Sequence, residues 1–168
     1  VGNLEYGCYA YQHHCLTLFV LGKPLNEVRR EVFYANTILL QLDQHTPANY
    51  CKIQSHAINK LQDQGNPNSF LVSLEEQTPD PQTEVYQKFQ TAHDRLGLCL
   101  FHFFRLVLAC FFADWQQARQ EANDLQPYLV AGMGLVLIPL VYFYESLAIL
   151  ADLSQTQPDF ERQWQRVE

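Results

Sequence analysis

The chain has few charged residues, and lysine is especially scarce. Of its 168 residues, 17% are charged; 11 are lysine or arginine and 18 are aspartate or glutamate, which gives a net charge of −7. A surface that neutralises phosphates needs clustered basic side chains. We therefore expect neither a nucleic-acid partner nor attraction to an acidic membrane surface. Hydrophobic residues make up 48% of the chain, enough to bury the core of one domain.

Glycine is also scarce, and the motifs of common enzyme classes are missing. The seven glycines form neither of the two glycine-rich patterns that hold nucleotide phosphates. The sequence has no Gly-x-Ser-x-Gly elbow and no identifiable Ser–His–Asp set. The triplet His93-Asp94-Arg95 holds the residues of a kinase catalytic loop in a different order, and we interpret it as a solvated helix turn. We expect no enzymatic activity, catalytic residue or cofactor within these residues.

The cysteines do not form a recognisable framework. They are five in number, include no Cys-x-x-Cys pair and lie in apolar stretches, at positions 8, 15, 51, 99 and 110. This pattern favours buried thiols in a reducing compartment, so we expect a cytoplasmic protein. A metal site that combined Cys8 and Cys15 with His13 and His14 is disfavoured, because adjacent histidines point about 100° apart on a helix. We expect no metal. No targeting segment is visible, and we expect the chain to be excised from a longer one.

Alternating strand-like patterns are rare, whereas helical periodicity runs through the whole chain. Glycine and proline punctuation predicts helices over about 3–21, 24–44 and 46–64. A Pro-rich loop is expected at 65–83, followed by a long central helix from 80 to about 112. Two further helices are expected within 114–126 and 135–153, and another begins at Pro158. The prediction is an all-α single domain spanning 1–168, with about six to seven helices in antiparallel hairpins.

Two apolar stretches, 96–113 and 129–151, approach the length of a membrane span, so a membrane hairpin has to be considered. Arg105 lies near the centre of the first stretch, and Glu145 lies within the second. Each charge costs a few kcal/mol in hydrocarbon, and Pro139 interrupts the second stretch. We therefore expect both stretches to lie in a protein core, with no membrane partner.

Residues 108–118 (LACFFADWQQA) resemble the middle of a tetratricopeptide repeat. In that repeat a first helix ends in small and aromatic residues, and a small residue follows where the second helix crosses closely. Residues 15–28 (CLTLFVLGKPLNEV) have a similar layout, with Gly22 at the turn and Leu25 and Val28 in the positions of Trp115 and Ala118. Because Ala113 replaces the usual turn glycine, we predict a degenerate, TPR-like solenoid of stacked hairpins.

Two polar residues in the apolar central helix are candidates for a site. His102 and Arg105 are three residues apart and share a helix face, and a buried arginine needs a carboxylate partner, for which Glu145 is the expected residue. A structural ion pair is the simpler interpretation. The alternative is a recognition groove on the first helix of each hairpin. Its candidate contacts are Tyr9, Gln12 and His13 on one helix and His102 and Arg105 on the other.

A different class of function is a small-molecule sensor. The aromatic-rich centre would then leave an internal pocket of a few hundred Å³ for a ligand. The residues expected to line such a pocket are Phe101, Phe104, Trp115, Tyr142 and Tyr144.

Three segments together resemble a known family: NLEYGCYAYQHHCLTLFVLGKPLNEV at the start, AHDRLGLCLFHFFRLVLACFFADWQQARQEA in the centre and VYFYESLAILA near the end. They are similar to the helical region of large cyanobacterial-type signalling kinases. In those proteins a Ser/Thr kinase domain and an AAA-type ATPase precede this region, and GAF and sensor histidine kinase domains follow it. The resemblance implies a non-catalytic interaction and regulatory module in signal transduction. Its expected partners are flanking domains of the same chain or a signalling protein.

Overall fold

The computed structural model describes residues 2–63 and 81–156, and none of these residues is in a β-strand. The described part is all-α, as predicted. Its helices are α1 (Gly2–Val20), α2 (Leu25–Gln41), α3 (His45–Asp63), α5 (Pro81–Thr91), α6 (Arg95–Phe111), α7 (Trp115–Leu125), the 3₁₀-helix η1 (Gln126–Gly132) and α8 (Ile138–Thr156). Most of the predicted loop at 65–83, and the predicted helix from Pro158, lie outside the described residues.

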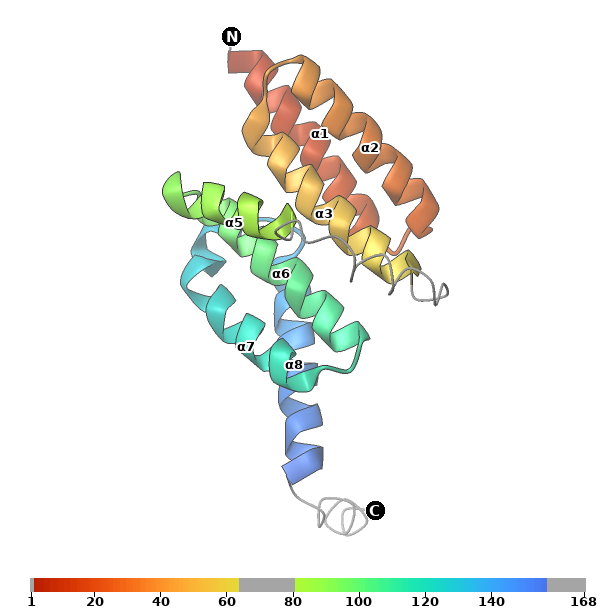
Figure 1. Cartoon of the computed structure of the whole chain (residues 1–168), viewed down its shortest axis with the longest axis vertical. Coiled ribbons are helices and arrows are strands. Elements are labelled where there is room, and N and C mark those ends of the chain that lie inside the picture. The colour runs from red at the N-terminus through yellow and green to blue at the C-terminus, as the bar shows by residue number, and fades with distance from the viewer. Residues whose placement is uncertain (1, 64–80, 157–168) are drawn as a thin grey trace.

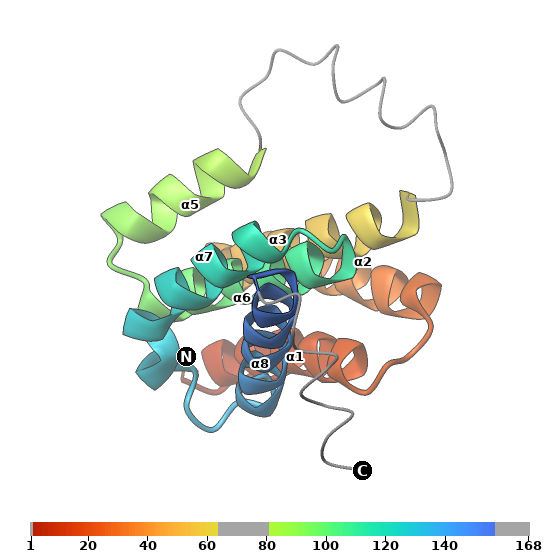
Figure 2. The same cartoon turned by 90° about the horizontal axis from the view of Figure 1, so that it is seen from below.

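The helices form two packed groups that meet at α3 and α6 (Figure 1). Helices α1, α2 and α3 lie side by side and enclose a small apolar core that includes Val28, Leu39 and Ile58. Helix α6 lies between α3 on one side and α7 and α8 on the other, as the second view also shows (Figure 2). Its buried residues, among them Phe103 and Phe104, form the centre of the largest apolar cluster. The expectation of a central helix in this region is confirmed.

The predicted continuous helix from 80 to about 112 is wrong, because the chain turns at residues 92–94 and divides it into α5 and α6. His93 adopts a left-handed backbone conformation with φ of 52°. Asp94 then caps α6, since its carboxylate accepts a hydrogen bond from the backbone N–H of Gly97 at 2.9 Å. This boundary was not predicted, because the turn contains neither glycine nor proline and the helical spacing of apolar residues does not visibly stop there. In the triplet His93-Asp94-Arg95, the first two residues therefore belong to an interhelical turn and Arg95 begins α6.

The turns after α1, α2, α5 and α6 share one geometry. Each contains a residue with positive φ: Gly22 at 68°, Asp43 at 58°, His93 at 52° and Ala113 at 56°. In each turn the N–H of this residue donates to the carbonyl three residues earlier, and the next N–H donates to the carbonyl five residues before it. This is the Schellman pattern for ending a helix. Gly22 and Ala113 therefore occupy the same place in their turns.

Replacing Ala113 by glycine is expected to stabilise the protein by about 1 kcal/mol, because the left-handed conformation strains a residue that has a Cβ. The matched control is Ala10→Gly at an exposed position within α1. There the same exchange is expected to destabilise the protein by about 1 kcal/mol. Urea unfolding followed by circular dichroism measures both effects. Destabilisation by Ala113→Gly would contradict the assigned turn.

The membrane alternative is not supported by the described helices. In residues 2–63 and 81–156, no helix combines the length and the apolar character that crossing a bilayer requires. The second apolar stretch is not one helix, because η1 ends at Gly132 and α8 begins at Ile138. The two stretches pack through α6 and α8, with Leu106, Ala109 and Ala148 in a shared apolar cluster that also takes in Ala118 of α7.

Candidate functional site

Helix α6 is apolar on nearly every side, and its two polar residues after the first turn meet a carboxylate from α7. His102 Nδ1 lies 2.8 Å from Glu121 Oε2, and Arg105 Nε lies 2.5 Å from Glu121 Oε1. Gln117, one turn before Glu121, also donates to Oε1. His102 and Glu121 are buried, whereas the Arg105 side chain is 35% exposed. One buried carboxylate therefore orients an imidazole and a guanidinium, and the arginine extends from the interior to the surface.

The ionised form of Glu121 is stabilised by its partners. Burial alone would raise the pKa of this carboxyl, but the hydrogen bonds and positive charge supplied by His102 and Arg105 outweigh burial and lower its pKa below the ordinary glutamate value. Aromatic rings complete the surroundings. The His102 ring stacks on Tyr128 with an interplanar angle of 2°, and the Arg105 guanidinium lies 5.4 Å from the centre of the Phe101 ring.

The expected pairing of Arg105 with Glu145 is wrong. Glu145, on α8, instead accepts a hydrogen bond from Gln126 Nε2 at 3.0 Å. Arg105 pairs with Glu121 because α7 follows α6 through a tight turn and packs along it, which brings Glu121 beside Arg105. The simpler interpretation, a structural ion pair in the core, describes the buried half of this cluster.

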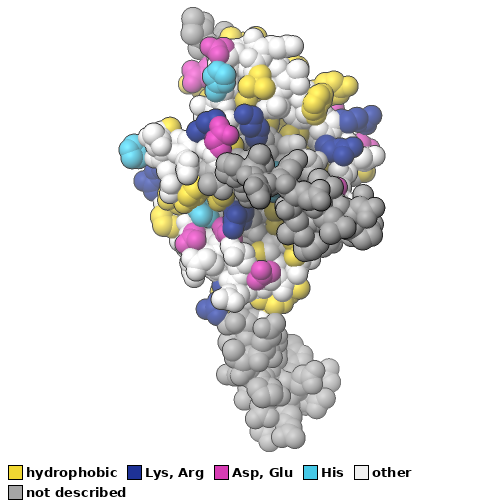
Figure 3. All heavy atoms as spheres, viewed as in Figure 1, with side chains coloured by type: hydrophobic (Ala, Val, Ile, Leu, Met, Phe, Trp, Pro, Cys, Tyr) yellow, Lys and Arg dark blue, Asp and Glu magenta, His cyan; other side chains and the backbone are white. Residues whose placement is uncertain are grey.

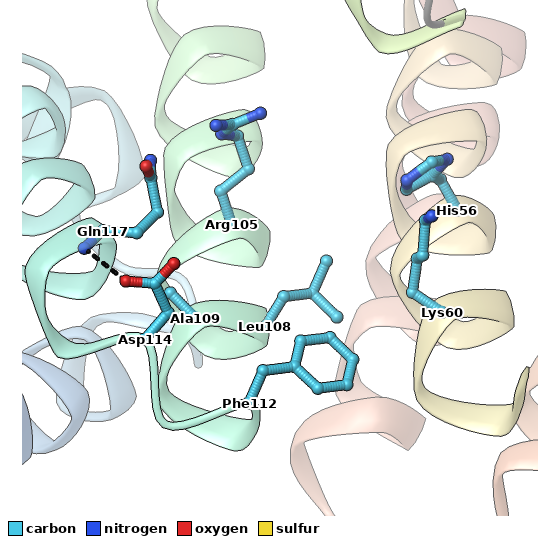
Figure 4. Close-up of a pocket in the computed structure, with 8 residues that line it drawn as sticks. All are labelled: His56, Lys60, Arg105, Leu108, Ala109, Phe112, Asp114 and Gln117. Carbon is cyan, nitrogen blue, oxygen red and sulfur yellow. Dashed lines mark hydrogen bonds between the residues drawn. The ribbon is translucent and has the colours of Figure 1, made fainter. Parts of the chain in front are cut away.

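The exposed half of Arg105 borders a groove between α6 and α3. The groove has a volume of about 340 Å³. Arg105, Leu108 and Phe112 line its α6 side and face His56 and Lys60 on α3 (Figure 4). The remaining lining residues are Ala109, Asp114 and Gln117. Residues at 105, 108 and 112 share one side of α6, and residues at 56 and 60 share one side of α3, since both sets follow helical spacing.

The groove brings basic groups together in an acidic protein. Lys60 and Arg105 approach it from opposite walls, although the chain carries a net charge of −7. Asp114 is the acidic residue among the lining side chains, and its carboxylate caps α7 by accepting from the backbone N–H of Gln117 at 3.0 Å. The face seen in Figure 3 likewise displays lysine and arginine side chains among acidic and apolar ones. The lining therefore combines two basic side chains and one carboxylate with an apolar surface.

The five candidate contacts are not brought into one surface. His102 is 6% exposed and Gln12 is 1% exposed, so both are interior side chains in this structure. Tyr9 is half-buried and packs against Tyr50, with 6.3 Å between the ring centres. His13 is also half-buried, and burial lowers its pKa. Of these candidates, Arg105 lines the groove, and the other groove residues were not expected from the sequence.

The aromatic residues proposed to line a sensor pocket have different surroundings, and Phe101 is buried in the large core cluster. Phe104 lies in the large core cluster, where its ring meets that of Phe19 edge-on. Trp115 packs against the cluster between α6, α7 and α8, and Tyr144 packs against both this cluster and the large one. Tyr142 is exposed on α8. None of these residues lines the groove between α3 and α6.

The potential metal ligands already have hydrogen-bond partners, and the potential nucleophiles are buried. In the described part of the chain, the group close enough to share a cation is His102, Glu121 and Asp124, whose ligand atoms lie within 4.8 Å of one another. A cation there would compete with Arg105 for Glu121, while both oxygens of Asp124 accept from Gln120. The cysteines are buried free thiols, and burial raises the pKa of Cys99 and Cys110 to about 11. Such thiols are poor nucleophiles at neutral pH.

Sequence reasoning missed Glu121, although a signal was present. Glu121 is three residues after Ala118, on the same helix face as the buried Ala118, Ala122 and Leu125. Its carboxylate could therefore be expected to face the core. The pair His56 and Lys60 also had a signal, since i,i+4 spacing places both on one side of α3. That this side faces Phe112 follows from tertiary packing alone.

Comparison with known proteins gives no match: no protein-family model, curated protein or solved structure matches this chain.

Proposed function

We propose that this chain is a non-catalytic helical interaction module that binds a protein segment and thereby regulates neighbouring signalling domains. The observation that carries the proposal is the groove between α3 and α6, where two elements distant in sequence place basic and apolar side chains opposite each other. A groove of this kind suits a chain segment that offers a carboxylate and an apolar side chain. The resemblance to the helical region of multi-domain kinases adds the context of a kinase and an ATPase.

The regulatory step would act through the junction of the two helix groups. The groove lies where α3 faces α6, and the same junction is fastened further along by Tyr50 on α3, whose hydroxyl donates to the Asp94 carboxylate at 2.8 and 2.9 Å. A segment bound in the groove contacts both helices, so it favours one relative placement of the two groups. Flanking domains attached to the two groups would then change their populations of active states.

The test mixes the 168-residue chain with the separately purified kinase and ATPase domains that the resemblance places in the same protein. We expect saturable binding by isothermal titration calorimetry and a changed phosphorylation or ATPase rate. Crosslinks are expected through Lys60, in the groove, more than through Lys52, which is exposed elsewhere on α3. Absence of binding to every flanking domain, with no change in either rate, would contradict the proposal.

The sensor alternative keeps one supporting observation. A volume of about 340 Å³ is within the range of small-molecule sites. The groove is open, however, and its lining is not the aromatic set expected for a sensor. A small ligand that stabilises the chain against thermal unfolding and loses this effect in Phe112→Ala would support that alternative.

A further inference from the structure

We infer that a second hollow, between α2 and α3, binds an organic phosphate monoester, with the phosphate group against Arg29 and Arg30 and the carbon part against Phe33. The two helices lie side by side (Figure 1). The hollow has a volume of about 270 Å³, and its lining residues are Arg29, Arg30, Phe33, Tyr34, Ser55 and Asn59. This site is separate from the groove between α3 and α6, and the inference does not rest on the proposed function.

The polar groups of this hollow are hydrogen-bond donors that the protein itself does not use. Within residues 2–63 and 81–156, neither Arg29 nor Arg30 has an ion pair or a side-chain hydrogen bond. In the same described ranges, the Ser55 hydroxyl and the Asn59 amide have no side-chain hydrogen bond either. Arg105, by contrast, is already paired with a buried carboxylate. The donors of the second hollow are therefore all available to a ligand.

The charge of this hollow favours an anion, because its lining includes two arginines and no carboxylate. The acidic residues nearest in sequence are Glu27, Glu31 and Asp63. Glu27 and Glu31 are four residues apart and share a side of α2. Burial raises the pKa of Tyr11 on α1, and the charge of Glu31 raises it further, so this side of α2 is turned toward α1. Asp63 is the last residue of α3, one turn beyond the hollow, and in the described ranges none of the three forms an ion pair with either guanidinium.

The directions of the donors match a phosphate group better than a carboxylate. Arg29 and Arg30 are adjacent, so their side chains leave α2 about 100° apart and reach a shared ligand from different sides. Ser55 and Asn59 approach from α3. A phosphate monoester offers three terminal oxygens and carries a charge of about −1.5 to −2 at neutral pH. A carboxylate offers two oxygens in one plane, which suits a single guanidinium.

The aromatic side chains provide a surface for the carbon part of the ligand. Phe33 is 65% exposed, and its ring meets the Tyr34 ring edge-on, with 6.0 Å between the ring centres. Arg29 and Phe33 are four residues apart, so they share a side of α2, about 6 Å apart along its axis. An apolar group joined to the phosphate through its ester oxygen therefore contacts the ring, and burying this surface is favourable. Inorganic phosphate leaves the ring uncovered.

The test titrates phenyl phosphate into the 168-residue chain by isothermal titration calorimetry. Saturable binding is expected. Inorganic phosphate, which lacks the ring, and benzoate, which replaces the phosphate by a carboxylate, are expected to bind at least about fivefold more weakly, a loss of roughly 1 kcal/mol. Binding is also expected to weaken as ionic strength rises, because the arginines are exposed.

Two sets of variants locate the site. Arg29→Gln and Arg30→Gln are each expected to weaken binding about tenfold, as for the loss of a hydrogen bond to a charged group. The matched control is Arg119→Gln, the same exchange at an exposed position of α7, which leaves the affinity unchanged. Phe33→Ala is expected to weaken binding, whereas Phe111→Ala, at a 60% exposed phenylalanine of α6, leaves it unchanged. Circular dichroism checks folding, and if a variant does not fold, the comparison of the three ligands still decides the question.

A phosphotyrosine peptide, Gly-Ser-phosphoTyr-Ser-Gly, distinguishes two sources of the phosphate monoester. Tighter binding of the peptide than of phenyl phosphate supports a phosphorylated protein side chain, and equal or weaker binding supports a small phosphate ester. Absence of saturable binding of both ligands up to about 1 mM would overturn the inference. Unchanged affinity when Arg29→Gln and Arg30→Gln are combined would overturn it as well. Neither result bears on binding of the flanking domains, so the proposed function stands or fails by its own test.

Discussion

Replacing Glu121 by alanine is expected to lower the free energy of unfolding by about 3–5 kcal/mol, because the exchange leaves Arg105 and the buried His102 without their carboxylate. This is a large fraction of the stability of a typical domain, about 5–15 kcal/mol. Urea unfolding at neutral pH measures the change. Asp124→Asn is the matched control on α7, since Asp124 is partly exposed and bonds Gln120 of its own helix, and its substitution is expected to change stability by no more than about 0.5 kcal/mol.

The effect of Glu121 is expected to depend on pH. Its pKa in the folded protein is lowered: burial opposes ionisation, but the hydrogen bonds from His102 and Arg105 outweigh it. The stabilisation is therefore fully present above the unfolded glutamate pKa of about 4.3 and is lost as pH falls through the lower folded value. The free energy of unfolding of the isosteric variant Glu121→Gln is expected to differ most from that of the wild type at neutral pH and least in strong acid. A difference that grows as pH falls would contradict the assigned ion pair.

Replacing Gly97 by leucine is expected to destabilise the protein by about 3 kcal/mol, because the added side chain overpacks the core and displaces a buried phenylalanine. A Cβ at this position would lie 2.5 Å from the nearest atom of the Phe89 ring, which is 2% exposed. The close approach of α5 to α6 depends on this glycine. Hydrogen exchange is expected to accelerate in α5 more than in α2, which packs elsewhere.

The control for Gly97 is Gly7→Leu in α1, where an added Cβ meets nothing within 4 Å. There the exchange is expected to stabilise the protein by about 0.8 kcal/mol through helix propensity alone. Combining Gly97→Leu with Phe89→Ala is expected to cost less than the sum of the two single changes, since the second change makes room for the leucine. Additive costs would show that the ring of Phe89 is not what the leucine displaces.

Local patterns located most helices correctly. Periodicity with Gly22, Pro24 and Pro47 as punctuation placed α1, α2 and α3 within a few residues of their observed bounds. The same reasoning failed between α5 and α6, because His93 ends a helix in the conformation usually taken by glycine. Asp94, a good capping residue before an apolar run, was the signal for this boundary.

The candidate site was found only in part. His102 and Arg105 stood out as polar residues within an apolar helix, and the structure does join them through a shared carboxylate. The partner was misassigned, since a helix face has several possible neighbours and the sequence does not show which one packs against it. Gln12 and His13 carried a polar pattern on α1, but Gln12 is turned into the core.

The sequence by itself determined the all-α class, the burial of the cysteines and the central place of the helix around Phe103, because each follows from local composition and helical spacing. Tertiary structure alone decided that Glu121 is the partner of Arg105 and that Lys60 faces Phe112 across a groove. The physical reason is that periodicity fixes which side of a helix is apolar, whereas the pairing of two helix faces depends on the packing of the whole core.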